Sequence, residues 1–158
     1  EVRFSNEEDI KMRKEFVMRG QTASGSTEVL NFSGFKPGLA YRMTEFTIYP
    51  GTGIGSSSFE GAASITAGKT AIDPTIPNFN DDGLIATTYT QIIGSGSNAM
   101  FKQSVVNDTF LITQNLILMV QDVNVGQPVN WQCRFESVKM SGPEEAVTNY
   151  KQFAISDE

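Results

Sequence analysis

Between residues 129 and 136 the chain alternates strictly between apolar and polar side chains, and this pattern constrains the fold more than any other. In an extended strand, successive side chains point to opposite faces, so one face enters a core and the other meets solvent or a partner. In the segment 110–120 five apolar residues share one parity, with Gln114 as the one polar exception; they are Phe110, Ile112, Leu116, Leu118 and Val120. A tight connection at 122–128 predicts that the two segments form an antiparallel hairpin. The inward parity of the later segment holds Val129, Trp131, Cys133 and Phe135.

The rest of the chain also reads as strands separated by turns. Strands are expected at 27–33, 39–49, 59–67 and 84–93, with turn residues between them. The apolar phase shifts near Thr44, which predicts a bulge or a strand that is buried on both faces. Short strands without intervening helices predict an all-β protein, with one antiparallel β-sandwich or jelly-roll-like domain. A length of 158 residues suits one such domain.

The two ends of the chain differ from this middle part. Residues 1–19 are highly charged and are expected to form a flexible N-terminal arm, although Phe16 to Met18 would equally open a first strand. The β-sandwich domain is then expected over 20–140. Residues 141–158 begin with Pro and acidic residues and carry apolar residues at helical spacing, so they predict a short helix or an extended arm.

Composition excludes several kinds of chemistry. The chain has no histidine and one cysteine, so it has no Ser-His-Asp or Cys-His pair, no internal disulfide and no Cys-rich zinc site. The net charge of −6 is the wrong sign for a nucleic-acid binder. The apolar run at 110–120 is much shorter than the roughly 20 residues of a membrane span. We therefore expect no cofactor, no nucleic acid and no membrane, and a lone thiol fits synthesis in a reducing cytosol.

One short motif resembles a phosphate-binding loop. Residues 63–70 run from Ala63 through four residues to Gly-Lys-Thr. A phosphate loop needs a helix directly after the Lys-Thr pair, because the helix N-terminus holds the phosphates. Pro74 and Pro77 follow at once and block such a helix. The segment is therefore interpreted as a strand and a turn.

A second motif has the spacing of half a calcium loop. Its first ligand is Asn rather than Asp, and the position of the expected bidentate acid is Tyr89. An Asx-rich turn leading into a strand explains the same residues. An ion held with ligands from elsewhere in the chain remains the alternative, with weak metal candidates Asn78, Asn80 and Asp82.

The remaining cue is a surface rich in uncharged polar residues. Such faces are cheaper to bury at an interface than charged ones. Together with two terminal arms that can lie on a neighbour, they favour a component of an assembly, expected as a homo-oligomer, although a lone soluble sandwich would have the same features. The residues expected at its interfaces are Val2, Phe4, Phe16, Thr88, Thr90, Tyr150 and Phe153.

Three stretches of the sequence carry a family resemblance. They are FKPGLAYR with FTIYP at 35–50, AIDP with PNFNDDGLI at 71–85, and VNDTF with TQNL at 106–116. Over about residues 27 to 140 the chain resembles small β-sandwich virion structural proteins of marine tailed bacteriophages. The resemblance implies a capsid decoration or cement protein that binds the major capsid protein or other virion proteins. It implies no catalytic residues.

These observations leave three hypotheses. The first is a non-enzymatic decoration protein, made in the host cytoplasm and located in the virion, that stabilises the phage head. The second is a tail, fibre or knob module that contacts the host surface or its glycans. The third is a β-sandwich enzyme, which ranks last because neither Asp81-Asp82 nor Glu144-Glu145 can form a catalytic pair: adjacent residues on an extended chain point to opposite faces.

Overall fold

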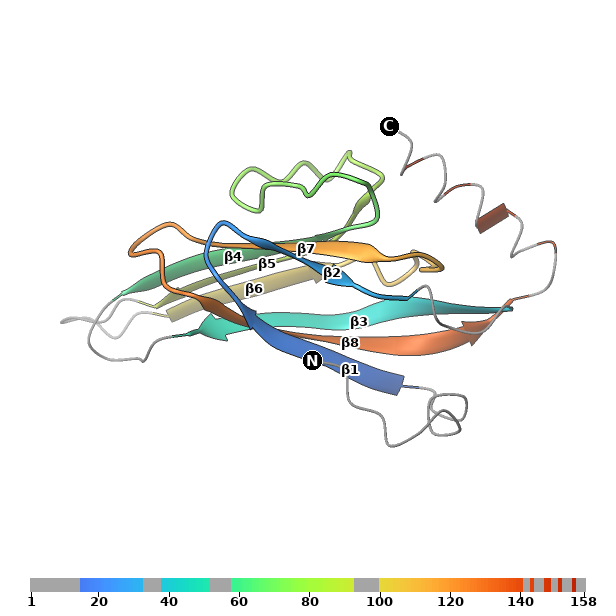
Figure 1. The fold of residues 1–158 in the computed structure, drawn as a ribbon, viewed down its shortest axis with the longest axis horizontal. Helices are drawn as coiled ribbons and strands as arrows, with labels where there is room; N and C mark the ends of the chain where they lie inside the picture. The colour runs from blue at the N-terminus through green and yellow to red at the C-terminus, as the bar shows by residue number, and fades with distance from the viewer. Residues whose placement is uncertain are drawn as a thin grey trace.

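The protein is a two-layer antiparallel β-sandwich (Figure 1). The computed structural model describes residues 15–32, 38–51, 58–92 and 100–140, with positions 143, 147, 148, 151 and 155. Its strands are β1 (Glu15–Thr22), β2 (Thr27–Leu30), β3 (Leu39–Pro50), β4 (Phe59–Thr66), β5 (Leu84–Ile92), β6 (Met100–Val106), β7 (Leu116–Asp122) and β8 (Val129–Lys139). This confirms the predicted all-β class.

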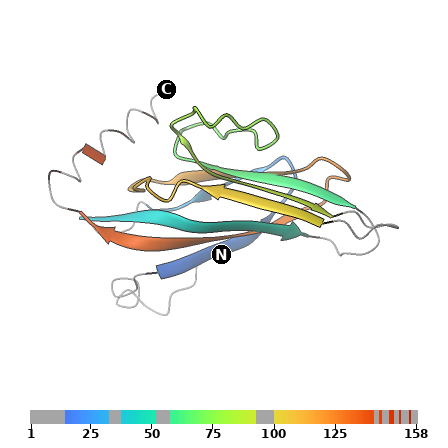
Figure 2. The same ribbon diagram turned by 180° about the vertical axis from the view of Figure 1, so that it is seen from behind.

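The strands wind as in a jelly roll with one departure. One sheet has the order β1-β8-β3, and the other has the order β2-β7-β4-β5-β6. In a jelly roll the first strand pairs with the eighth, the second with the seventh, the third with the sixth and the fourth with the fifth. Three of these pairs are present here, but β6 pairs with β5 instead of with β3. Figure 2 shows β6, in yellow, along the side of the sandwich where β3 also ends its sheet.

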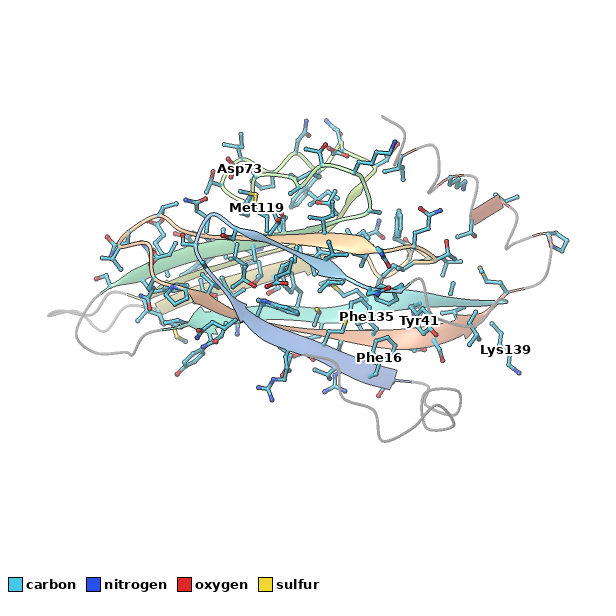
Figure 3. The ribbon with its side chains drawn as sticks, viewed as in Figure 1. Phe16, Tyr41, Asp73, Met119, Phe135 and Lys139 are labelled. Atoms are coloured by element: carbon cyan, nitrogen blue, oxygen red, sulfur yellow. The ribbon has the colours of Figure 1, made fainter. Side chains whose placement is uncertain are left out.

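The core lies between the inner faces of the two sheets. The alternation predicted for β8 is confirmed, because its four apolar side chains are buried while the polar ones between them are partly exposed. They face the buried Leu116, Leu118 and Val120 of β7. Within this core four rings pack with centroids 5.0–6.2 Å apart, and Figure 3 labels three of them; the rings are Phe16, Phe32, Tyr41 and Phe135.

The predicted bulge in β3 is confirmed. Met43 lies opposite Phe135 and Phe46 lies opposite Cys133, with a register shift between Met43 and Glu45. The extra residue, Thr44, is exposed. A strict two-residue repeat would turn either Met43 or Phe46 out of the core, so the bulge is what keeps both apolar halves of this long strand inside.

Three predictions about the chain's organisation are corrected. The segments 110–120 and 129–136 do not form a hairpin, because β7 and β8 lie in opposite sheets and face each other across the core. The first strand begins at Glu15, so residues 15–19 belong to the sandwich rather than to an N-terminal arm. Strand β6 was not expected at all. Residues 1–14 lie outside the described part, and beyond residue 140 the five described positions are helical.

The connection from β7 to β8, which carries the chain from one sheet to the other, is organised by Asp122. Its carboxylate is buried and accepts hydrogen bonds from the amides of Asn124 and Gln127, both at 3.0 Å. Gly126 within this corner has φ +76°, a left-handed conformation that glycine adopts without strain. The corner therefore depends on one acidic side chain and one glycine.

Candidate functional site: the outer face and edge of the five-stranded sheet

The two outer faces of the sandwich differ sharply in charge. The three-stranded sheet turns outward three acids and three bases: Glu15, Arg19, Arg42, Glu45, Arg134 and Glu136. Arg42 pairs with Glu136 at 3.1 Å, and Arg134 lies 3.7 Å from Glu45. These side chains are well solvated where they are and would lose that solvation in an interface. The outer face of the three-stranded sheet is consequently more favourable in contact with solvent than buried in an interface.

The five-stranded sheet turns outward almost no charge. Its register places a mixture of apolar, amide and hydroxyl side chains on the outer side, and we call this surface the low-charge face. Met119, which Figure 3 labels, lies on it. Among the strand residues of this face Glu60 is the one carboxylate and there is no base, whereas the β4–β5 loop beside it carries the exposed Lys69, Asp73, Asp81 and Asp82. The members of the face that reach solvent are Thr27, Val29, Glu60, Thr87, Tyr89, Gln91, Phe101, Gln103, Val105, Ile117, Met119 and Gln121.

The loop between β4 and β5 covers part of this face. Its base is closed by the amide of Ala67, which donates to the carbonyl of Gly83 at 2.8 Å. The hydroxyl of Ser64, buried beneath the loop, donates to the carbonyl of Ile72. Figure 3 shows Asp73 in this loop, on the same side of the sheet as Met119. The loop thus forms a wall over the middle of the low-charge face.

A hollow of about 450 Å³ lies between this wall and the end of the sheet. Tyr89 and Glu60 form its floor, where the phenol donates a 2.6 Å hydrogen bond to the carboxylate. This hydrogen bond is the main cause that raises the pKa of Tyr89 above its usual value. Pro74, Pro77 and Val123 are among the residues that line the sides. A partly exposed ring beside a carboxylate offers one apolar surface and one hydrogen-bond acceptor to a ligand.

Strand β6 forms the far edge of the same sheet. Every residue from Met100 to Val105 is exposed, and Val106 is partly so. Strand β3 of the other sheet approaches β6 and Val106 packs against the core, but the six residues before Val106 stay exposed. Met100, Phe101 and Val105 keep 71%, 51% and 41% of their surface exposed. Alternation could not reveal β6, because Val106 alone among its residues packs against the core.

The interface residues expected from sequence are only partly placed by the structure. Phe16 is buried in the ring cluster rather than exposed on an arm. Thr88 and Thr90 are also buried, because they share the inward parity of Ala86 in β5. These three expectations are wrong, and the exposed neighbours of the two threonines on β5 belong to the low-charge face instead. The other four expected residues lie outside the described ranges: Val2, Phe4, Tyr150 and Phe153.

The weak metal candidates lie in the β4–β5 loop and are exposed. The side-chain oxygen of Asn78 accepts a hydrogen bond from the amide of Asn80, and the carbonyl of Asn78 accepts one from the amide of Asp81. This is the geometry of an Asx turn, the alternative that the sequence left open. Within the described ranges no three His, Cys, Asp or Glu side chains gather as metal ligands. An ion at Asn78, Asn80 and Asp82 stays a prediction.

Cys133 lies deep in the core between the two sheets. It is fully buried, and its thiol is 3.7 Å from the carbonyl of Met18. Burial raises the pKa of this thiol far above its ordinary value, so the nucleophilic thiolate does not form near neutral pH. The residue is therefore a packing element of the core.

Comparisons with known proteins add no relative. Neither the family models nor the curated proteins that were searched give a match to this chain. In the part that the structure describes, no helix is long and apolar enough to span a bilayer.

Proposed function

We propose that the protein is a non-enzymatic virion structural protein, a decoration or cement protein of a tailed bacteriophage head. In this proposal it binds the major capsid protein or a neighbouring virion protein through the low-charge face. It acts as a homo-oligomer and stabilises the shell by protein–protein contacts. The charged face of the three-stranded sheet then points to the medium.

The observation that carries this proposal is the contrast between the two faces. Burying an unpaired charge costs several kcal/mol, roughly, whereas amide and hydroxyl groups can exchange water for partners on a neighbouring protein. The strands of the low-charge face carry one acid, Glu60, and a set of exposed apolar side chains at the edge, and the other charges on this side lie in the exposed part of the β4–β5 loop. Jelly-roll sandwiches are also a recurrent architecture of viral shells and lectins, which supports the proposal as analogy.

Binding to heads tests the proposal directly. Purified protein is mixed with undecorated empty heads of the phage that encodes it, and both co-sedimentation and the temperature of head disruption are measured. We expect binding and a higher disruption temperature. Absence of both would overturn the proposal.

Two matched variants locate the binding face. Gln121 projects from β7 on the low-charge face, and Gln132 projects from β8 on the charged face, both partly exposed. Gln121→Lys is expected to weaken head binding at least tenfold, and Gln132→Lys is expected to bind as wild type. The reverse order would assign binding to the charged face.

A second function, contact with host glycans from a tail or fibre, is favoured by the hollow at Tyr89. Aromatic rings pack against sugar rings, and the carboxylate of Glu60 can accept hydrogen bonds from hydroxyl groups. A glycan array with wild type and Tyr89→Ala tests it. Binding that the variant loses, together with no affinity for heads, would replace the decoration role by this one.

A further inference from the structure

The sandwich has four sheet edges, and three of them are protected. Strand β2 is only four residues long, and β1 carries Glu15 and Arg19 on its outward side. The free side of β3 is occupied at its start, where Tyr41 and Ile112 exchange two backbone hydrogen bonds. Short strands, charges and covering segments are the usual means of blocking edge-to-edge pairing. Among the described residues β6 has none of these except Lys102.

The backbone of β6 is turned so that alternate residues offer free hydrogen-bonding groups. The amide of Asn107 donates to the carbonyl of Ile85 at 2.8 Å, so these two residues form a hydrogen-bonded pair at the end of the β5–β6 ladder. Along an antiparallel ladder, hydrogen-bonded pairs alternate with non-hydrogen-bonded pairs. The odd-numbered residues of β6 therefore point their amide and carbonyl groups at β5. The even-numbered residues, from Met100 to Val106, point theirs out of the sheet.

The sequence of β6 is also symmetric in hydropathy. It reads MFKQSVV, with two apolar residues, three polar residues and two apolar residues. If two copies run antiparallel with Gln103 at the centre, Phe101 meets Val105 and Met100 meets Val106 of the other copy. Lys102 then lies opposite Ser104, so the one charge of the strand does not face itself.

This register agrees with the direction of the backbone groups. Centring on Gln103 pairs even-numbered residues with even-numbered ones, and these are the residues whose amide and carbonyl groups are free. Gln103 itself then forms a non-hydrogen-bonded pair with its copy, in which Cα atoms are about 4.5 Å apart. A register centred on Lys102 would place two like charges opposite each other, which destabilises a pair. Centring on Gln103 also pairs all seven residues of β6 with residues of β6 in the other copy.

We propose that β6 is a self-association edge, through which two copies of this chain join their five-stranded sheets about a two-fold axis at Gln103. The inference deepens the proposed function and rests on it for the expectation of a homo-oligomer. It extends the low-charge face continuously across two molecules. One strand edge buries less surface than a standard stable interface of roughly 1,600 Å², so the dimer forms reversibly and depends on concentration.

Charge variants at the axis test the register. Gln103→Lys and Gln103→Glu each place like charges opposite each other, so each variant alone is expected to sediment as a 17.3 kDa monomer. Their equimolar mixture is expected to dimerise at least tenfold more tightly than either alone, while wild type shows a concentration-dependent rise toward twice the chain mass. The matched control is Gln91→Lys on β5, which does not face its copy and is expected to dimerise as wild type.

A cysteine variant supplies an independent readout. Gln103→Cys is expected to form an intermolecular disulfide under mild oxidation, because the Cα separation of a non-hydrogen-bonded pair lies within disulfide range. Gln91→Cys is expected to remain largely unlinked, and the buried Cys133 does not interfere.

Two results would overturn the proposal. One is a wild-type monomer up to about 1 mM with no preferential cross-link at position 103. The other is a wild type that stays monomeric while Gln103→Cys forms its disulfide-linked product only with a virion protein on the heads, which would mean that the edge takes a strand of that protein. A dimer that forms in solution without binding heads would contradict the decoration role and leave the β6 pairing standing.

Discussion

Replacing Asp122 by Ala is expected to destabilise the protein more than any other single change at a polar residue of the β7–β8 corner. The carboxylate is only 3% exposed and accepts the amides of Asn124 and Gln127. Hydrogen bonds to a charged group contribute about 1.5–3 kcal/mol each. Loss of both, reduced by water entering from the exposed side of the corner, gives an expected cost of about 3–4 kcal/mol.

Urea denaturation measures this cost. Trp131 is the one tryptophan of the chain and is buried, so its fluorescence reports unfolding of the core. The free energy of unfolding of Asp122→Ala is compared with that of wild type at pH 7. Asp122→Asn, which keeps one oxygen acceptor, is expected to fall between the two.

The matched control is Asp82→Ala in the exposed β4–β5 loop, where a change below about 0.5 kcal/mol is expected. A cost below about 1 kcal/mol for Asp122→Ala would refute the argument. It would mean that the corner holds its shape through Gly126 and backbone packing, and that the two amides find other acceptors.

Three further predictions concern the core. Phe16→Ala should lower the free energy of unfolding by about 3–4 kcal/mol in the same denaturation assay, because it leaves a cavity in the ring cluster. Phe79→Ala, at a side chain 62% exposed, should lower it by less than about 1 kcal/mol. Equal losses for the two variants would contradict the burial of Phe16. The thiol of Cys133 should resist alkylation at pH 8 in the native protein and react fully in urea, and rapid labelling without denaturant would contradict its burial. Burial raises the pKa of Tyr41 above its ordinary 10.0, so the unfolded chain releases this proton first and stability should fall as pH rises beyond about 10. Tyr41→Phe should flatten that fall, measured by denaturation from pH 8 to 11.

Alternation predicts well where one face of a strand is buried and the other is not. The four inward residues of β8 and the bulge of β3 followed from it. The hairpin error has a physical cause, because two strands with apolar faces satisfy the same pattern whether they are neighbours in one sheet or face each other in two. The register of Val129 with Thr22 and Pro50 shows the second arrangement.

The candidate site was harder to predict for related reasons. In β5 both parities carry threonine, so composition could not show that Thr88 faces the core while Thr87 faces out. Strand β6 buries only Val106, and that in part, so its residues show no period of two. A signal was nevertheless present in the apolar–polar–apolar order of residues 100–106, which is informative only when a strand is considered together with a second copy of itself.

The closed base of the β4–β5 loop also makes this protein a scaffold for display. Because the amide of Ala67 meets the carbonyl of Gly83, the two ends of the loop stay together whatever its length. Doubling a loop costs only about 0.6 kcal/mol of closure entropy, and exposed tips are where inserted peptides are best tolerated. Ile76 lies at such a tip and is 75% exposed. A foreign peptide inserted beside it would project from the sandwich without altering the register of any strand.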